Sequence, residues 1–376
     1  MGTRPISWFI NLFKRGGRMQ RDYTLDRLKA IAIFLACQAH YMHFNDSAID
    51  NFWAILSCAG VPLFFMINGA LLFHKHFSIQ KHIQKTFRVL GLCIIWKVIT
   101  VFVLGVLRGV NPFQNGRAQF INYVIGKNGL DGFEVGHFWY LYALFGVYCI
   151  YPFLRAAWDT EAQHRAIWFI LAVIGIFTFG FNAINFGQSV FCYLTGMNSP
   201  FSIYSANSFY IFGSYGYCVF WFLLGAELYN DERWNAHSVN MSGAWWPVSF
   251  IVGWFLLFGM NRFQNTVGDA NCIVIDGYFC IPTLLMCLGL FQWFITNTEL
   301  RKKPAVPLIR TIGENTWGIY MLHMIVGVFF LKAQSWFHFP TGIPLDLIKT
   351  SWMLLGSIAV LHIMKKIPWL RELLIF

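Results

Sequence analysis

The sequence predicts an all-α membrane protein with about ten transmembrane helices and with both termini in the cytoplasm. Of its 376 residues, 57% are hydrophobic, 19% are aromatic and 12% are charged, whereas a soluble domain has about 25% charged residues. Ten apolar segments follow one another, each near the roughly twenty residues that a spanning helix needs. With the N-terminus placed inside, 21 of the 28 Lys and Arg residues fall in inner segments and 6 fall in outer loops. This positive-inside bias indicates an even number of spans.

The first predicted element is a basic amphipathic arm, residues 1–25, which is expected to lie on the anionic cytoplasmic surface. The arm has no long apolar core, so the first span is expected to be retained rather than removed as part of a signal peptide. Residues 26–376 show no internal repeat or low-complexity region, and we predict that they form one transmembrane domain. Its spans are predicted near 27–45, 52–73, 86–107, 136–155, 166–185, 208–229, 243–261, 272–296, 308–331 and 346–364.

The net charge of +11 would also suit a nucleic-acid-binding protein. The concentration of basic residues in inner loops favours membrane topology as its cause, so no nucleic-acid partner is expected. The nine cysteines are scattered, most of them within apolar stretches, and are interpreted as small core residues. The sequence contains no metal-type spacing of ligands, no Gly-rich phosphate loop after a strand and no GxSxG elbow, so we expect no metal.

The first span carries two polar side chains that a spanning helix rarely contains. Lys29 and His40 are eleven positions apart, which places them on one face of a helix and separates them by roughly 16 Å along its axis. Lys29 is predicted at the inner rim and His40 in the outer half. Because ionisable residues within spans usually serve a function, this stripe is the strongest candidate for catalytic residues.

Two further histidines are predicted at a similar depth. His137 begins the fourth span, three residues after Glu134, and His323 lies past the middle of the ninth. His40, His137 and His323 are therefore predicted to line one outer-facing cavity. The alternative for each histidine is that it only bonds a backbone carbonyl.

The second inner loop, HKHFSIQKHIQKTFR, is basic at helical spacing. Lys75, Lys81, Lys85 and Arg88 could simply meet lipid headgroups under the positive-inside rule, or they could form a cytosolic site for a phosphorylated cofactor. Lys97, about six residues into the third span, could either snorkel or line the path of that cofactor.

Five stretches together resemble the acyltransferase-3 family of integral membrane acyltransferases. KAIAIFLACQAH (29–40) resembles the (R/K)-x10-H motif, VPLFFMINGALLF (61–73) the Pro-x-Phe-Phe-x-x-Ser-Gly-Tyr/Phe segment, and KTFR (85–88) the Arg-x-x-Arg motif. GHFWYLYALFGVYCIYPFL (136–154) is similar to the His-x-Trp-Phe-Leu segment, and TWGIYMLH (316–323) to Gly-Ile-Tyr-Leu-x-His. The motifs occur in order over about 300 residues.

The chain departs from these motifs at several positions. Lys29 and Lys85 replace the commoner arginines, which keeps the charge but loses the planar fork of the guanidinium. Asn68 stands where Ser is usual, and Ala70 where an aromatic residue is usual. The chain ends at Phe376 without an appended hydrolase-like domain, which resembles the single-domain members that acetylate sugars directly.

The resemblance implies a membrane O-acyltransferase of the bacterial inner membrane. Such an enzyme moves an acyl group, most often acetyl from cytosolic acetyl-CoA, to a sugar hydroxyl of a cell-surface polysaccharide or its lipid-linked precursor (O-antigen, enterobacterial common antigen or capsule). The head of the donor would lie near Lys29, Lys81, Lys85 and Arg88, and its thioester near His40. Neutral His40 could act as a general base or take the acyl group itself.

The acceptor side is predicted from depth and from the same resemblance. Glu134 or Asp46 could orient the ring of His40 by depth alone, and aromatic side chains at the outer surface could stack on the sugar. The predicted substrate-binding residues are Glu134, His137, Trp139, Tyr320 and His323.

Several alternatives stay open. They are a succinyl donor, a non-glycan acceptor, a transporter or flippase of glycan precursors, and a non-catalytic partner in polysaccharide assembly. The oligomeric state is open as well.

Overall fold

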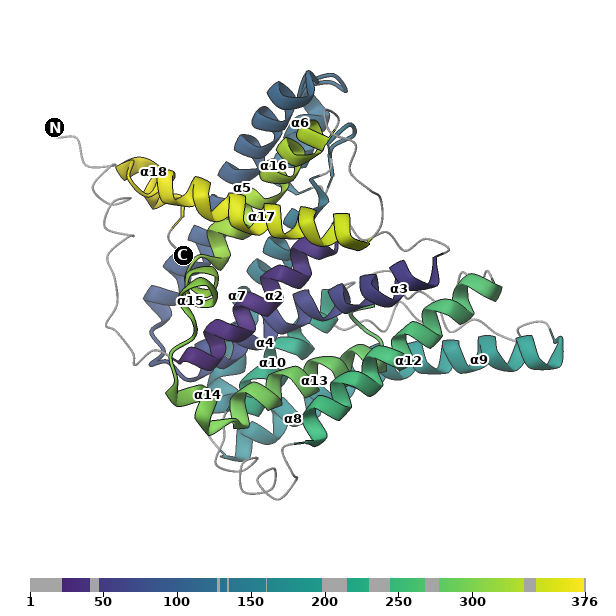
Figure 1. Cartoon of the computed structure of the whole chain (residues 1–376). Helices are drawn as coiled ribbons and strands as arrows, with labels where there is room; N and C mark the ends of the chain where they lie inside the picture. Colours follow the sequence, from purple (N-terminus) through teal and green to yellow (C-terminus); the bar gives the residue numbers. More distant parts are fainter. Residues whose placement is uncertain are drawn as a thin grey trace.

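The computed structural model describes residues 22–40, 47–126, 129–133, 135–159, 161–197, 215–229, 244–267, 277–334 and 343–374. The described residues form helices, with an isolated β-bridge between Leu130 and Phe133 and no strand. The helices pack into one bundle in which elements far apart in the sequence lie side by side (Figure 1). The all-α prediction is confirmed.

The longer helices account for the predicted spans. Their bounds are α2 (Tyr23–Gln38), α3 (Ala48–Ala54), η1 (Ile55–Ala59), α4 (Gly60–Phe73), α5 (Ile79–Arg108), η2 (Gly136–Phe138), α7 (Trp139–Trp158), α8 (Glu161–Gly175), η3 (Ile176–Gly180), α9 (Phe181–Thr195), α10 (Gly216–Tyr229), α12 (Trp245–Val267), α13 (Ile281–Thr296), α16 (Thr316–Gln334) and α17 (Ile343–Met364). The short helices are α6 (Arg117–Ile125), α14 (Thr298–Lys302), α15 (Pro307–Glu314) and α18 (Pro368–Glu372).

Six helical runs in the described part of the chain are long and apolar enough to cross a membrane. They are Ala48–Phe73, Ile79–Arg108, Gly136–Trp158, Gln163–Thr195, Thr316–Gln334 and Leu345–Met364. The helices α10 and α13 are apolar but shorter. Each of the ten predicted spans overlaps one of these helices, α2 or α12, so the chain is a polytopic membrane protein. The predicted arm, residues 1–25, lies almost wholly outside the described residues.

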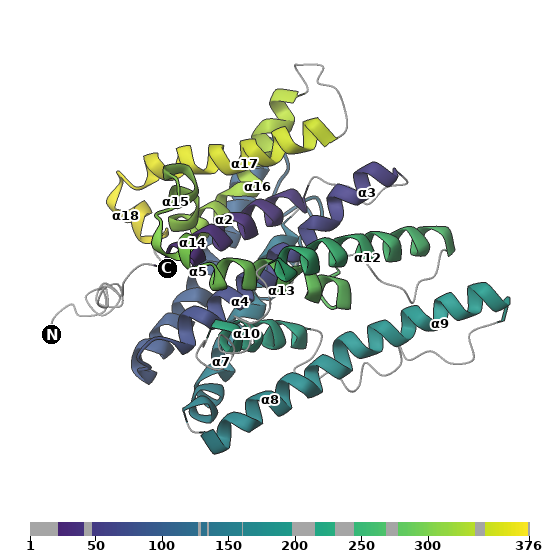
Figure 2. The same ribbon diagram turned by 60° about the horizontal axis from the view of Figure 1, so that its bottom comes forward.

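Two of the differences between the helices and the predicted spans have local reasons. The predicted span 308–331 is divided at Asn315, whose amide donates to the Thr311 carbonyl and closes α15 before α16 begins. The predicted span 166–185 is longer, because helix continues through the π-helical turn η3 and on to Thr195. Figure 2 shows α8 and α9 as one long rod at the edge of the bundle.

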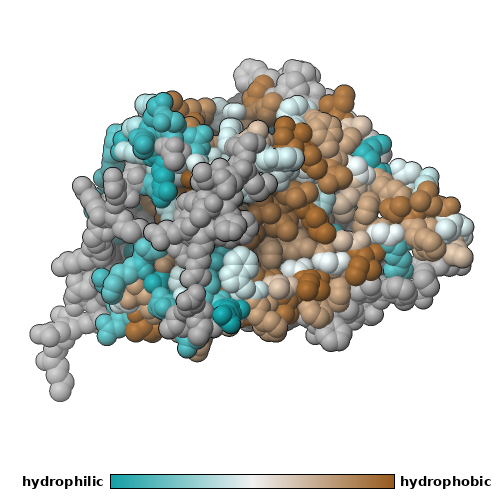
Figure 3. Space-filling model, turned by 90° about the horizontal axis from the view of Figure 1, so that it is seen from below, coloured by the Kyte–Doolittle hydropathy of each residue, from teal (hydrophilic) through white to brown (hydrophobic). Residues whose placement is uncertain are grey.

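The surface fits a protein that contacts lipid. Large apolar side chains are strongly exposed on the outer helices, among them Val106, Phe153 and Leu194 at 83%, 78% and 76%. The face shown in Figure 3 has a broad apolar area in its middle, and hydrophilic residues gather towards one end. Apolar surface of this extent is costly in water and favourable against hydrocarbon.

Helix α2 lies among α4, α13, α15, α16 and α17 and is fastened at its first turn. Asp22 caps it by accepting a hydrogen bond from the Thr24 amide at 2.9 Å, and the Tyr229 hydroxyl donates to the other carboxylate oxygen at 2.7 Å. Arg27 donates to the carbonyls of Leu300 and Lys303 at the end of α14. These bonds satisfy helix-end groups and fix the part of α2 that carries Lys29.

Replacing Asp22 with asparagine is expected to lower the melting temperature at pH 7. Burial alone would raise the pKa of the Asp22 carboxyl, but hydrogen bonds from Thr24 and Tyr229 and the charge of Arg301 outweigh it and hold that pKa below its usual range. A lowered folded-state pKa gives stability above the unfolded value, near 3.9, and that stability is lost as the pH falls through the folded value. The difference from wild type should therefore shrink below about pH 4.

Thermal unfolding in detergent between pH 3 and pH 7 measures this difference. Asp159→Asn is the matched control, because that side chain is 54% exposed and pairs with Arg155 at 3.0 Å, and it should change the melting temperature little. A gap between Asp22→Asn and wild type that stayed constant over the whole pH range would contradict the electrostatic origin.

Helices α4 and α10 approach so closely that only glycine fits at two reciprocal positions. A Cβ atom on Gly69 would lie 1.8 Å from the Phe222 carbonyl oxygen, and one on Gly225 would lie 2.1 Å from the Met66 carbonyl oxygen. Small residues allow such close backbone approach between membrane helices. The contact fixes α4, whose Asn68 faces the cavity described next.

Candidate active site

Three histidines from three separate segments meet at one place. The ring centroids of His40 and His323 are 5.1 Å apart, those of His137 and His323 are 5.0 Å apart, and those of His40 and His137 are 6.1 Å apart. His40 follows the end of α2, His137 lies in η2, and His323 lies within α16. We call these three residues the histidine cluster. The structure therefore brings together the three histidines that the sequence placed at a similar depth.

The ring of His323 is held in one tautomer. Its Nδ1 lies 2.6 Å from the Tyr320 carbonyl oxygen, and because a carbonyl only accepts, Nδ1 carries the proton. In the neutral ring, Nε2 is then the nitrogen with the free lone pair. His323 does bond a backbone carbonyl, which was the alternative to a functional role for each histidine. It also contacts both other histidines.

The two other histidines differ in exposure. His137 is 5% exposed, and neither of its ring nitrogens has a hydrogen-bond partner in the described part of the chain. His40 is exposed. A buried polar group without a partner costs free energy, so an incoming polar ligand would compensate His137.

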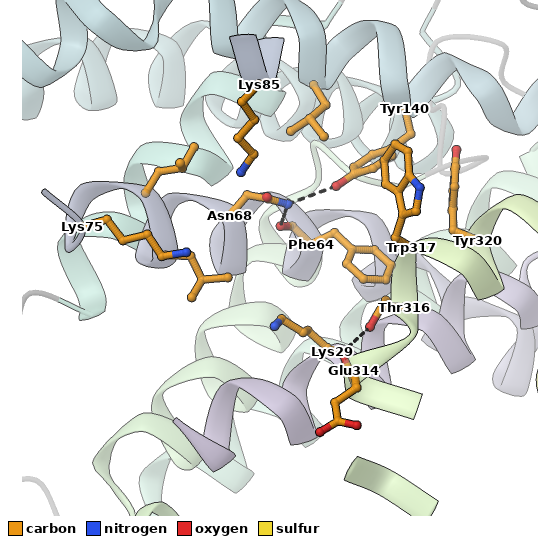
Figure 4. Close-up of a pocket in the computed structure, with 14 residues that line it drawn as sticks. Lys29, Phe64, Asn68, Lys75, Lys85, Tyr140, Glu314, Thr316, Trp317 and Tyr320 are labelled. Carbon is orange, nitrogen blue, oxygen red and sulfur yellow. Dashed lines mark hydrogen bonds between the residues drawn. The ribbon is translucent and has the colours of Figure 1, made fainter. Parts of the chain in front are cut away.

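A cavity of about 320 Å³ lies between α2, α4, α5, α7 and α16. Polar lining residues include Lys29, Asn68, Lys75, Lys85 and Tyr140. Apolar lining comes from Phe64, Leu71, Leu72, Leu144 and Trp317. Figure 4 shows the amino groups of the three lysines pointing into the same space, with Trp317 and Tyr320 on the other side of Asn68.

The cationic side of the cavity contains two of the four predicted donor-binding residues. Lys29 and Lys85 line it, whereas Lys81 is exposed to the outside and neither Lys81 nor Arg88 lines the cavity. Lys29 also lies 3.8 Å from Asp26, and Lys85 lies over the Tyr148 ring at 5.1 Å from its centroid. Lys75 joins them from the loop after α4.

Tyr320 connects the cavity with the histidine cluster. It lines the cavity, and its ring centroid is 5.8 Å from that of His137 and 5.6 Å from that of His323. Its hydroxyl donates to the His137 carbonyl oxygen. Tyr320 is thus the residue that the lysine-lined cavity and the histidine cluster have in common.

Of the remaining predicted residues, Trp139 is the one that the structure describes. Trp139 stacks on Tyr215, with ring centroids 5.3 Å apart, and also contacts Tyr278 at 5.8 Å; no contact with the histidine rings is recorded for it. Glu134 and Asp46 lie outside the described residues. The described residues include no group of three or more His, Cys, Asp or Glu arranged to hold a metal ion.

Lys97 neither snorkels nor lines the cavity. It is completely buried and donates to the Tyr123 carbonyl and, at 3.0 Å, to the Tyr142 hydroxyl. Its ammonium also lies over both tyrosine rings, at 4.2 Å and 4.6 Å from their centroids. Lys97 therefore joins α5 to the end of α6 and to α7, which begins two residues after His137.

The site combines three kinds of chemistry. Clustered ammonium groups attract phosphates or other anions, the apolar walls accommodate a thin uncharged chain, and neutral imidazoles can accept a proton from a hydroxyl. Sequence reasoning did not select Asn68, Tyr140 or Trp317 for the site, whereas Lys75 belongs to the basic loop that it named. For Asn68 a signal existed, because it departs from the resembled motif.

Comparison with known proteins gives one match. A family model described as an acyltransferase domain, acyltransferase-3, matches residues 22–362. No curated protein and no solved structure matches the chain. The match spans every element of the site, from the start of α2 to α17.

Proposed function

Since this chain belongs to the acyltransferase-3 family and is a membrane acyltransferase, we propose that it moves acetyl from cytosolic acetyl-CoA to a sugar hydroxyl. The acceptor is a cell-surface polysaccharide or its lipid-linked precursor, and the enzyme works in the bacterial inner membrane. The lysine side of the cavity then faces the cytosol and the histidine cluster faces the opposite compartment. This assignment agrees with the distribution of Lys and Arg among the loops.

One observation carries the proposal: the cavity that the lysines line is also lined by Tyr320, whose ring contacts two members of the histidine cluster. Lys29, Lys75 and Lys85 line it, and Tyr320 connects it to His137 and His323. Coenzyme A has a polyanionic nucleotide head and a long, thin pantetheine arm that ends in the thiol. The head suits the lysines, and the arm suits a narrow apolar cavity that leads towards the histidines.

The proposed chemistry uses His40 as the base. The acceptor hydroxyl gives its proton to the neutral imidazole while its oxygen attacks the thioester carbonyl carbon. The C–S bond then breaks, an ester forms, and the proton on His40 neutralises the departing thiolate. Alternatively His40 attacks first, releases the thiol and then passes the acetyl group from its ring nitrogen to the hydroxyl.

The acceptor is proposed to bind on the histidine side. His137 is buried with both ring nitrogens without partners, which suits hydrogen bonds from sugar hydroxyls. Tyr320 and Trp139 supply aromatic faces, and such faces contact the apolar sides of sugar rings. Glu134 keeps its predicted place in the acceptor site, three residues before His137 in the sequence.

The test uses purified protein in proteoliposomes with acetyl-labelled acetyl-CoA and an added lipid-linked glycan fraction. Label on the glycan supports the proposal, and label that accumulates on the protein favours the acyl-histidine route. Succinyl-CoA in a parallel reaction tests the identity of the acyl group. Absence of both transfer and donor binding would overturn the proposal and favour a transporter.

A further inference from the structure

Three polar side chains are linked by hydrogen bonds across the wall of the cavity between α4 and α7. The Tyr148 hydroxyl donates to Oδ1 of Asn68 at 3.1 Å, and Nδ2 of Asn68 lies 3.2 Å from the Tyr140 hydroxyl. Nδ2 also donates to the Phe64 carbonyl oxygen at 2.9 Å. Figure 4 shows Asn68 between Phe64 and Tyr140.

The direction of each hydrogen bond follows from the groups involved. The Phe64 carbonyl only accepts, so the amide nitrogen of Asn68 must face it. An amide nitrogen only donates, so Tyr140 must accept the second bond from Nδ2. Within the described residues this is the one hydrogen bond that the Tyr140 hydroxyl makes, and its own proton is therefore available for another acceptor.

The Tyr140 hydroxyl lies in the cavity wall between the lysines and Tyr320. Tyr140 is 7% exposed and lines the cavity, and its ring centroid is 5.5 Å from that of Tyr320, which contacts the histidine cluster. On the other side of Asn68 lie the lysines (Figure 4). The Tyr140 hydroxyl is thus a neutral donor midway between the cationic side and the histidines, beside the apolar side chains of Phe64, Leu144 and Trp317.

A buried neutral donor in an apolar wall selects a neutral acceptor. A phosphate would be drawn to the ammonium groups of the lysines, whereas an amide carbonyl matches a single hydroxyl donor. The pantetheine arm of coenzyme A contains two amides between its nucleotide head and its sulfur. The pantetheine arm, with these two amides, therefore fits the middle of this cavity in both position and chemistry.

We propose that the Tyr140 hydroxyl donates a hydrogen bond to an amide carbonyl of the pantetheine arm and that Asn68 positions it. This inference rests on the proposed function, because it needs an acyl-CoA donor. The bond fixes how far the arm enters the cavity, and hence where the thioester stops relative to the histidine cluster.

Two of these three hydrogen-bonded residues, Asn68 and Tyr140, depart from the resembled motifs. Asn68 stands at a Ser position, and Tyr140 stands at the Phe position of the His-x-Trp-Phe-Leu segment. Because phenylalanine has no hydroxyl, this hydrogen bond is absent from a chain that follows the motif. The two residues contact each other directly in this chain.

The experiment distinguishes the contribution of the pantetheine arm to binding from that of the nucleotide head. Calorimetry on the purified full-length protein in detergent measures binding of coenzyme A and of adenosine 3′,5′-bisphosphate, which lacks the arm. Tyr140→Phe should weaken coenzyme A binding by about three- to tenfold, as expected for one hydrogen bond, and leave the bisphosphate unchanged. Asn68→Ala should give the same pattern, whereas Lys85→Ala should weaken both ligands.

Each outcome has a distinct meaning, and an unchanged melting temperature of Tyr140→Phe shows that the variant is folded. If Tyr140→Phe binds coenzyme A as wild type does, or loses affinity equally for both ligands, the inference is overturned while the proposed function stands. If wild type binds neither ligand, the proposed function fails and the inference fails with it.

Discussion

Replacement of His40 with alanine is expected to reduce acetyl transfer by about a thousandfold, within the range that a positioned general base contributes. His40 lies 5.1 Å from His323 and 6.1 Å from His137 between ring centroids, and it follows the end of α2, eleven residues after Lys29. Donor affinity should change little, because the lysine side of the cavity is unaltered. Transfer of labelled acetyl in proteoliposomes and calorimetric binding of coenzyme A measure the two effects separately.

His362→Ala is the matched control for His40→Ala. His362 is an exposed histidine in the last turn of α17, and its loss should leave transfer unchanged. His323→Ala is an informative companion, since its Nε2 carries the free lone pair in the described tautomer. Full transfer by His40→Ala would remove His40 from the mechanism, and loss of transfer only in His323→Ala would assign the base to His323.

Gly225→Ala is expected to cause a large loss of stability, because the added methyl group would overlap backbone atoms of α4. Its Cβ would lie 2.1 Å and 2.2 Å from backbone atoms of Met66, and backbone cannot move aside as a flexible side chain can. Overpacking of this kind costs about 1–3 kcal/mol or more. Thermal unfolding in detergent should show a clear fall in melting temperature.

Gly146→Ala provides the control, because no atom lies within 4 Å of a Cβ at that position. Alanine also has the higher helix propensity, so Gly146→Ala should be neutral or slightly stabilising. Because Met66 is two residues before Asn68, any shift of α4 in Gly225→Ala should also weaken coenzyme A binding. Wild-type stability in Gly225→Ala would show that the two helices are less closely packed than described.

The fold could be predicted largely from the sequence because a bilayer imposes simple rules. Backbone polar groups must be paired within a helix, and a helix must be about twenty apolar residues long. The ten apolar segments and the distribution of Lys and Arg were therefore enough to predict the fold class. The division at Asn315 and the extension to Thr195 were missed, because side-chain capping and a π-helical turn leave apolar content unchanged.

The site was predictable only in part. Helical periodicity placed Lys29 and His40 on one face, and depth placed His137 and His323 at a similar level. Which basic residues face the cavity was not predictable, because the rotation of α5 and the path of the loop after α4 decide it; Lys75 lines the cavity and Lys81 does not. The bond between Asn68 and Tyr140 depends on how α4 packs against α7, and sequence spacing carries no such information.

The long helix formed by α8, η3 and α9 couples the site to the thickness of the bilayer. Its helical run, Gln163–Thr195, has 33 residues and so measures about 50 Å, against a hydrocarbon core of about 30 Å. Such a mismatch is relieved by tilting of the helix or by local thickening of the lipid.

The inner half of this helix packs on α10. Phe179, at its π-helical turn, contacts Phe220 and Trp221 with ring centroids 4.8 Å and 5.5 Å away. Since α10 is joined to α4 through Gly69 and Gly225, a change in tilt is transmitted to the wall that carries Asn68. Lipids with longer or shorter acyl chains therefore act on the depth of the cavity as well as on the edge of the protein.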